Sequence, residues 1–241
     1  MSQNVDSCRD EDDGESSSVR EIIEWVSRGI IEGRLLPGGD LNSVDLAKRF
    51  NVSRTPVREA LFVLSREGLV DWSPRRRPRV SAVDLKEVRE IYHLRATLYG
   101  EVSAAIVARA SDADIESLWD AHRRLAEVAS HGDVDGYFWA NVAFRDEELR
   151  VCGNDVFKEV LGSMRMRINR LRRLSTSLPG RLNRSCADHQ RLCRAYAERD
   201  GVLAAALNRS IVLSALQAIE LAWDRVPNGA DAAVKGRKRS R

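Results

Sequence analysis

Residues 51–80, NVSRTPVREALFVLSREGLVDWSPRRRPRV, carry the clearest structural pattern of the chain. Apolar side chains recur in its first half at i, i+3, i+4 and i+7, a spacing that predicts a helix with one buried stripe. They are Val57, Ala60, Leu61 and Leu64. Ser53 is the expected N-cap, which places Val52 and Val57 at the two positions of a hydrophobic staple. Gly68 is expected to end the helix in the left-handed conformation.

A short apolar run follows Gly68 and leads into the basic stretch SPRRRPR, residues 73–79. Apolar residues flank this stretch on both sides, which predicts two short strands around a charged tip. They are Leu69, Val70, Trp72 and Val80. The order of helix, strand, charged tip and strand is that of a winged helix.

The residues before Asn51 supply two more helices. A helical pattern of apolar residues begins at Ser18 and stops near Gly33. Asn42 is placed to cap a short helix through Phe50, and Asn51 can end that helix. Three helices, of which the last two are joined by about three residues, form a helix-turn-helix. The third helix is then free to enter a major groove of DNA.

Arginines cover the exposed side of the third helix and the wing. Ser53 precedes Arg54, Thr55 and Arg58, which project from the first turns of the helix. A charged helix face is often only solvated, and this is the alternative interpretation. The wing favours nucleic acid, because clustered cations repel one another and a phosphate backbone relieves that repulsion. The wing arginines are Arg75, Arg76, Arg77 and Arg79.

Length and composition indicate an intracellular protein with a second domain beside the winged helix, which fits a regulator. A chain of 241 residues exceeds the usual size of one domain, and 43% hydrophobic residues suffice for two cores. Apolar runs are shorter than the ~20 residues of a membrane span, and no leader pattern precedes them, so we expect a cytoplasmic protein. Four cysteines are too few for a disulfide framework. The sequence has no GxSxG, HExxH or phosphate-binding loop, so we do not expect an enzyme.

The motif VSRTPVREAL, followed by GLV and a basic wing, resembles the DNA-binding domain of GntR-type transcription regulators. The resemblance covers roughly residues 18–83. It implies a dimeric bacterial repressor or activator that reads a short palindromic operator. By position, Ser53, Arg54, Thr55 and Arg58 match the family's DNA-contacting residues. The family often has a glycine at the wing tip where this chain has Arg77, which points to more charge contact with phosphate or the minor groove.

The remainder of the chain is expected to be helical, so the predicted fold class is mainly α. We expect an acidic tail over residues 1–17, a winged helix-turn-helix over 18–83, a helical effector-binding and dimerisation domain over 84–226, and a basic tail over 227–241. Caps and breaks predict six helices in an antiparallel bundle, with any ligand held between facing helices. They cover about 84–110, 111–128, 135–152, a segment around 164–171, 182–198 and 201–225.

This second half resembles the FCD effector domain of the FadR branch of the GntR family, over about residues 84–223. The framework residues that match are Arg95, Phe144, Gly153, Asn154, His189, Ala195, Asp200 and Ala204. Many such domains bind a divalent metal through an aspartate and three histidines. Here those positions hold Asn141, Arg145, His189 and Ile211, or Ser210 with a slip of one residue. Because a guanidinium has no lone pair to donate, we expect no metal and no other cofactor.

The resemblance places Arg145 at the position of the first histidine ligand, where its guanidinium could stand in for the positive charge of the metal. We therefore expect Arg145 to pair with the carboxylate or phosphate of a small effector, with Asn141, His189 and Arg95 adding contacts. The alternative is that Arg145 forms an internal salt bridge or reaches solvent. A second metal site is not expected around Cys186, because Cys193 lies about 10 Å further along the helix axis.

These patterns together predict a DNA-binding transcription regulator, expected to be a repressor, that is controlled by a small anionic metabolite. Dimerisation through the helical domains would set the spacing of two recognition helices. The alternative is a helical ligand sensor or scaffold that does not read DNA sequence. Salt-dependent, sequence-selective duplex binding distinguishes the two hypotheses.

Overall fold

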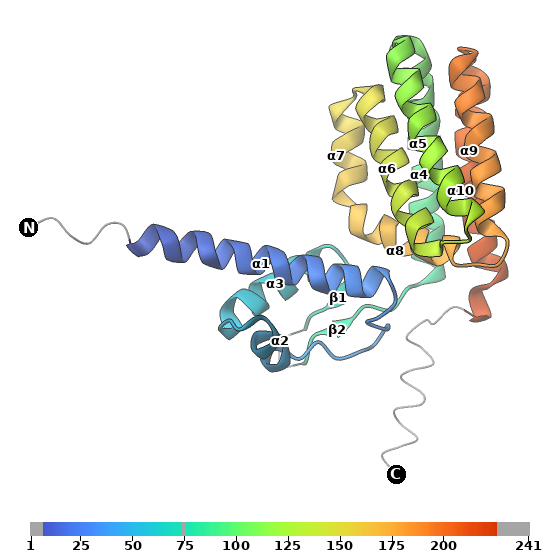
Figure 1. Cartoon of the computed structure of the whole chain (residues 1–241). Coiled ribbons are helices and arrows are strands. Elements are labelled where there is room, and N and C mark those ends of the chain that lie inside the picture. The colour runs from blue at the N-terminus through green and yellow to red at the C-terminus, as the bar shows by residue number, and fades with distance from the viewer. Residues whose placement is uncertain (1–6, 74–75, 226–241) are drawn as a thin grey trace, which may run out of the picture. The chain divides into compact units, whose positions relative to one another are not determined.

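The computed structural model describes residues 7–73 and 76–225, which form two compact units (Figure 1). One unit ends at Val83 and the other begins at Asp84. The first has three helices and a two-stranded sheet, and every element described in the second is helical. The predicted fold class, a winged helix-turn-helix followed by a helical bundle, is confirmed.

The elements of the first unit follow the predicted order. They are α1 (Ser7–Ile31), α2 (Ser43–Phe50), α3 (Arg54–Arg66), β1 (Val70–Asp71) and β2 (Arg79–Val80). Helices α1 and α2 both pack against α3, whose apolar stripe is completely buried. Helix α1 begins at Ser7 rather than at Ser18, inside the segment expected to be a tail. No proline interrupts residues 7–17, so the backbone can continue the helix toward Ser7.

The helix-turn-helix is bounded by its predicted capping residues. The side chain of Asn42 accepts a hydrogen bond from the backbone N–H of Val44 at 3.0 Å, and Asn51 ends α2 in the left-handed conformation at φ 53°. Ser53 is the N-cap of α3, as predicted, but its hydroxyl makes no capping hydrogen bond. Gly68 follows α3 at φ 73°, which confirms its expected left-handed conformation.

The wing is a short antiparallel sheet in which Val70 faces Val80 and Asp71 faces Arg79. Arg75 lies outside the described residues. Phe62 on α3 does not pack into the core of this unit. Its side chain is 54% exposed and meets the ring of Trp72 edge-on, at 6.4 Å between centroids.

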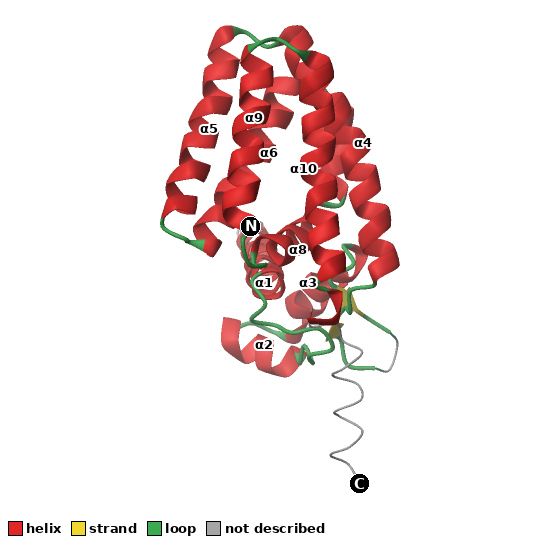
Figure 2. Cartoon of the chain, turned by 90° about the vertical axis from the view of Figure 1, so that its right-hand side faces the viewer, coloured by secondary structure: helices red, strands yellow, loops and turns green. Residues whose placement is uncertain are grey.

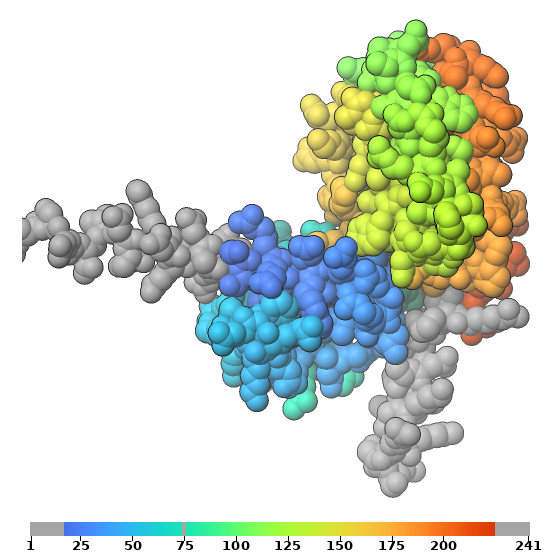
Figure 3. Space-filling model, viewed as in Figure 1, coloured from blue at the N-terminus to red at the C-terminus, as the bar shows by residue number. Residues whose placement is uncertain are grey.

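The second unit is a helical bundle. Its elements are α4 (Leu85–Arg109), α5 (Asp112–Ser130), α6 (Val134–Cys152), α7 (Asp155–Ser163), α8 (Arg165–Thr176), α9 (Arg181–Ala197), α10 (Gly201–Leu221) and a 3-10 turn (Trp223–Arg225). The most extensive helix pair is α4 with α10, and α5 packs against both α6 and α9. Figure 2 shows these long helices running along a common direction. Side chains fill the spaces between the ribbons on the face shown in Figure 3.

Two boundaries in the bundle differ from the sequence prediction. The sequence predicts one helix, around residues 164–171, between the helices that end at 152 and begin at 182, whereas the structure has α7 and α8 there. The break falls at Met164, whose φ of −112° and ψ of 9° are not helical, shortly after the helix-weakening Gly162. The last α-helix ends at Leu221 and tightens into the 3-10 turn, which is a common way for a helix to finish.

Helix α10 is the one described helix long and apolar enough to cross a membrane by composition. Within the bundle it packs against α4 and α9 and buries Ile211, Val212 and Ile219. It also buries Asn208, which is hydrogen-bonded to neighbouring helices. This packing accounts for the apolar composition of α10 as that of a core helix.

The same substitution at two glycines should have opposite effects on stability. Gly68→Ala forces a Cβ into the left-handed region and should cost about 1–2 kcal/mol of unfolding free energy. Gly162→Ala, at a helical position with open space around it, should stabilise by about 0.5–1 kcal/mol. Urea unfolding followed by circular dichroism measures both. An unchanged unfolding free energy in Gly68→Ala would contradict the left-handed conformation of Gly68.

Candidate functional site

The first candidate surface, called the recognition surface, consists of Ser53, Arg54, Thr55 and Arg58 at the start of α3. All four side chains are exposed, while Val57 and Leu61 on the opposite face are completely buried. The sequence pattern therefore separated the two faces correctly. No described acidic side chain forms an ion pair with Arg54 or Arg58.

Trp72 links the recognition surface to the wing. The guanidinium of Arg58 lies 6.0 Å from the centroid of the Trp72 ring, and Phe62 contacts the same ring. An aromatic ring attracts a cation without neutralising its charge, so the Arg58 guanidinium can still bind a polyanion. The contact limits the freedom of Arg58, which lowers the entropy lost on binding.

The wing adds more cations beside this surface. Arg76 and Arg77 are exposed and have no described ion-pair partner. Arg79 is exposed too, but its Nε donates to Oδ1 of Asp40 at 2.8 Å, a contact that ties β2 to the loop before α2. The structure therefore gives Arg79 a role in holding the wing that the sequence did not reveal.

The second candidate site is a small cavity of about 30 Å³ inside the bundle, called the arginine chamber. All four residues predicted to bind an effector line it: Arg95, Asn141, Arg145 and His189. The remaining lining residues come from α4, α8, α9 and α10. They are Tyr92, Arg172, Ser175, Thr176, Arg181, Ser185, Ile211, Val212 and Ala215. None of these described lining residues is acidic.

Arg145 lies in the chamber wall but forms an internal salt bridge. Its Nη1 donates to Oε2 of Glu148 at 2.7 Å and to the side-chain oxygen of Asn208 at 2.5 Å. Its guanidinium also lies 4.5 Å from the centroid of the Tyr99 ring. Burial lowers the pKa of Arg145 and the Glu148 carboxylate raises it, with a net rise. The internal ion pair, which was the alternative to a free anchor, is therefore present.

The carboxylate of Glu148 is the centre of a buried hydrogen-bond network. Its Oε1 accepts from the hydroxyl of Tyr196 at 2.7 Å and from the side-chain amide of Asn208 at 2.8 Å. Ser103 bonds to both of these partners at 2.8 Å. Glu148 is completely buried, so this network ties α4, α6, α9 and α10 to one charge.

Two arginines of the chamber were missed by the sequence prediction. Arg172 on α8 is 7% exposed and Arg181 on α9 is 8% exposed. Burial lowers the pKa of Arg172 to about 10 and also lowers that of Arg181. The sequence held a signal for Arg172, because it lies four residues after the apolar Ile168 and directly after Leu171, on the buried side of α8.

His189 is held as a neutral acceptor. Its Nδ1 lies 2.7 Å from the carbonyl oxygen of Ser185, so this nitrogen carries the proton and donates it. Its Nε2 is left as an acceptor facing the Asn141 amide at 3.4 Å. Burial, followed by the positive charge of Arg145, holds the pKa of His189 well below its usual range.

The donor set does not fit the divalent metal that the resemblance to FCD domains implies. Asn141 is a weak ligand, and the Arg145 guanidinium places a positive charge beside His189. Of the two candidates for the last position, Ile211 lines the chamber and Ser210 is exposed. Among the described residues, no group of three or more His, Cys, Asp or Glu side chains could hold a metal ion.

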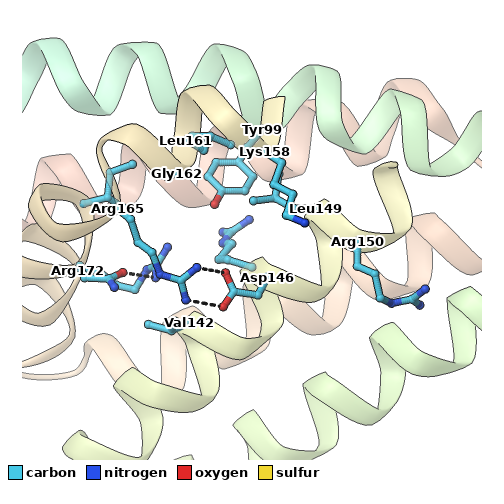
Figure 4. A pocket seen from close by; sticks show the side chains of 13 residues that line it. Tyr99, Val142, Asp146, Leu149, Arg150, Lys158, Leu161, Gly162, Arg165 and Arg172 are labelled. Carbon is cyan, nitrogen blue, oxygen red and sulfur yellow. Dashed lines mark hydrogen bonds and ion pairs between the residues drawn. The ribbon is translucent and has the colours of Figure 1, made fainter. Parts of the chain in front are cut away.

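A larger cavity of about 400 Å³ lies beside the chamber, and Arg145 and Arg172 line both. Figure 4 shows Arg165 paired with Asp146 through two hydrogen bonds, of 2.7 and 3.2 Å, at this outer cavity. Val142, Leu149 and Leu161 contribute apolar surface. The outer cavity therefore differs from the chamber in having an acidic side chain that pairs with one of its arginines.

The cysteines near the chamber have structural positions. Cys193 is completely buried and points its thiol toward the carbonyl of Leu118 at 3.8 Å. Cys186 lies 3.9 Å from Nε2 of His122. Burial raises the pKa of both thiols, which keeps them protonated and unreactive at neutral pH.

A winged helix-turn-helix with an exposed basic recognition surface, followed by a helical bundle with a polar cavity, defines a DNA-binding regulator with a ligand-sensing domain. Comparison with known proteins gives the family. Residues 18–80 match the profile of bacterial regulatory proteins of the gntR family, and residues 90–214 match that of the FCD domain. The chain belongs to the GntR family of transcription regulators with an FCD domain.

Similar proteins agree with this assignment. The chain is 27% identical over 201 residues to an HTH-type transcriptional regulator in an unstable DNA locus of Streptomyces ambofaciens, covering 83% of this chain and 84% of the relative. It is 23% identical over 185 residues to the Escherichia coli transcriptional repressor RspR, covering 76% of this chain and 80% of that protein. The family is one of transcription regulators and not of enzymes, as the sequence predicted.

Solved structures share the fold. The E. coli protein McbR/YncC has a TM-score of 0.71 at 20% identity and covers 86% of this chain and 98% of its own. A GntR regulator from Rhodococcus sp. RHA1 has a TM-score of 0.68 at 21% identity, with 85% and 98% covered. These likenesses concern the fold, and the two family matches show that the protein is a DNA-binding transcription regulator whose FCD domain is of the effector-binding type.

Removing one partner of the buried Arg145–Glu148 ion pair should lower the unfolding free energy strongly. Arg145→Met leaves the Glu148 charge buried without a cation and should destabilise the protein by about 3–5 kcal/mol. Adding Glu148→Gln should restore most of this loss, because the glutamine oxygen can still accept from Tyr196 and Asn208. Urea unfolding measures the double-mutant cycle. If the losses of unfolding free energy in the two single variants simply add in the double variant, Arg145 and Glu148 are not paired.

The buried neutral His189 should make stability depend on pH. Below the unfolded-state pKa of about 6.5 the unfolded chain takes up a proton that the folded chain does not, so stability should fall as pH decreases. Between pH 7.5 and pH 5.5, the unfolding free energy of the wild type should fall by about 1 kcal/mol more than that of His189→Gln. Unfolding curves of both proteins at the two pH values give this difference. Equal losses would show that His189 is protonated in the folded protein.

Proposed function

We propose that this regulator is a cytoplasmic homodimer that represses transcription from a palindromic operator and is controlled by a small anionic metabolite bound in the arginine chamber. The observation that carries the proposal is the pair of cationic sites, one exposed on α3 and the wing, the other buried in the bundle. The names of relatives support repression, since RspR is a repressor and another relative, from Paenarthrobacter nicotinovorans, is a probable D-xylose utilization operon transcriptional repressor.

The recognition surface has the chemistry that DNA requires. Arg54 and Arg58 are one turn apart and exposed, and their guanidinium groups can fork onto guanine edges or grip phosphates. The hydroxyls of Ser53 and Thr55 lie beside them at the helix N-terminus, where backbone N–H groups and the helix dipole also favour phosphate. The free hydroxyl of Ser53, which caps nothing, is available for such a contact.

The wing extends this contact to the neighbouring groove or backbone. The arginines proposed for it are Arg75, Arg76, Arg77 and Arg79. Two copies of the recognition surface in a dimer would read two half-sites about one helical turn apart, which is why a palindrome is proposed. The helical domains would hold the two copies together and so set this spacing.

The chamber is proposed to hold the effector through the charge of its arginines, with neutral side chains adding contacts. Arg95, Asn141, Arg145 and His189 would contact it, with no metal or other cofactor. Although Nη1 of Arg145 is occupied by Glu148, its Nε is buried without a partner and can still donate. Binding would change the arrangement of helices that hold the dimer, and with it the affinity for the operator, by a coupling of about 1–3 kcal/mol.

Replacing one arginine of the recognition surface should weaken operator binding. Arg54→Ala or Arg58→Ala should raise Kd for a duplex from the protein's own promoter by about 10-fold to 100-fold, because each loses a charged contact of about 1–3 kcal/mol. If the contact is to phosphate, the slope of log K against log salt should also fall by about one. Fluorescence anisotropy over a salt series measures both.

Arg66→Ala is the matched control, because Arg66 is an exposed arginine in the last turn of the same helix. It should bind within about 2-fold of the wild type, since charge contacts are lost only where DNA is touched. A wild type that binds promoter and scrambled duplexes alike would refute sequence-specific repression. That result would favour the alternative of a ligand sensor or scaffold that does not read DNA.

A further inference from the structure

The arginine chamber contains more positive charge than its surroundings neutralise. Arg145 is balanced by Glu148, but Arg95, Arg172 and Arg181 form no ion pair with a described acidic residue. These three side chains are 4%, 7% and 8% exposed. They come from α4, α8 and α9, so the charge converges on one cavity from three helices.

The unpaired arginines also have unused hydrogen-bond donors. Nε and Nη1 of Arg95, Nε of Arg172 and Nε of Arg181 are buried and have no partner. Buried polar groups in folded proteins are nearly always hydrogen-bonded, and buried charges are nearly always paired. Several such exceptions around one cavity indicate that their partner is a ligand.

The surroundings of the three arginines add positive potential, and the nearby Asp188 carboxylate, which forms its ion pair with Arg191, only partly offsets the charge of Arg181. Arg181 is the first residue of α9, whose first turn contains no acidic residue, so the positive end of the helix dipole adds to its charge. Arg172 has one neutral partner, the Asn169 side-chain oxygen, which accepts from Nη1 at 2.9 Å. Its lowered pKa, about 10, has burial as the first cause and includes repulsion from Arg95 and Arg145.

We infer that the arginine chamber selects a compact dianion, such as a short dicarboxylate, phosphate or sulfate, over a monoanion of the same size. This rests on the proposed function, in which the chamber is the effector site. A monoanion would leave two of the three excess charges buried without a partner, whereas a dianion leaves one. Carboxylate, phosphate and sulfate oxygens also match the forked donors of guanidinium groups.

The size of the cavity sets a second limit. A cavity needs about 10–15 Å³ for each water molecule, so about 30 Å³ corresponds to two or three waters. This suits an anion with few non-hydrogen atoms and not an extended chain. Hydroxyl groups of Ser175 and Ser185 line the same space and can complete the coordination of its oxygens.

Oxalate and oxamate test the charge requirement directly, because they are nearly the same size and carry two charges and one charge, respectively, at pH 7.5. Thermal unfolding and calorimetric titration of the full-length protein would be carried out at constant ionic strength with a chelator present. Oxalate should bind at least about 10-fold more tightly than oxamate, the difference expected for one further charge-assisted interaction. Equal affinities would overturn the inference.

The variant Arg172→Met separates a binding role from a structural one. Removing an unpaired buried charge should raise the melting temperature of the protein without ligand, whereas removing a structural contact would lower it. The same variant should lose the preference for oxalate. Arg167→Met on the same helix is the control, because Arg167 is 34% exposed and paired with Glu87, and it should keep the preference. An oxalate response unchanged in Arg172→Met would refute the inference.

Operator affinity, measured in parallel, separates this inference from the proposed function. Oxalate that binds in the chamber without changing operator affinity would support the charge selectivity and contradict the proposed control. A monoanion that binds more tightly than oxalate and changes operator affinity would support the proposed control and overturn the selectivity. If neither anion binds at millimolar concentration, the charge selectivity is overturned, whereas the proposed control by an effector is not.

Discussion

The buried carboxylate of Glu148 is the constraint on which the effector domain depends. A charge with no solvent access must be paired and hydrogen-bonded, and Arg145, Tyr196 and Asn208 satisfy it from three helices. This requirement fixes α6, α9 and α10 around one point, and Ser103 joins α4 to the same network. It also fixes Arg145 in the chamber wall, with one of its nitrogens already occupied.

The two units use the same side chain in opposite electrical settings. On α3 and the wing, arginines lie in water, where their mutual repulsion is screened and a DNA backbone can replace their counterions. In the chamber, arginines are removed from water, so each unpaired charge carries a large desolvation cost. Exposed arginines favour a long polyanion, whereas buried ones favour a small anion that can enter the bundle.

The sequence predicted most of the fold, because caps and apolar periodicity are local signals. Asn42, Asn51 and Gly68 mark their boundaries through side-chain or backbone chemistry that needs no tertiary contact. The chamber was predicted only in part, through the family positions of Arg95 and Arg145. Arg172 was missed, because five arginines crowd α8 and their burial is decided by packing against other helices. The pairing of Arg145 with Glu148 also required three-dimensional proximity to a network from four helices.

In this proposal, the effector domain binds an anion through the chamber arginines that form no ion pair with a described carboxylate of the protein. The most direct measurement is a crystal structure of the full-length protein grown with selenate, located by its anomalous scattering. We expect a selenium peak in the chamber within hydrogen-bond distance of Arg95, Arg172 and Arg181, with Arg145 still paired with Glu148. A chamber that holds only water, with each of those three arginines on a protein carboxylate, would contradict it.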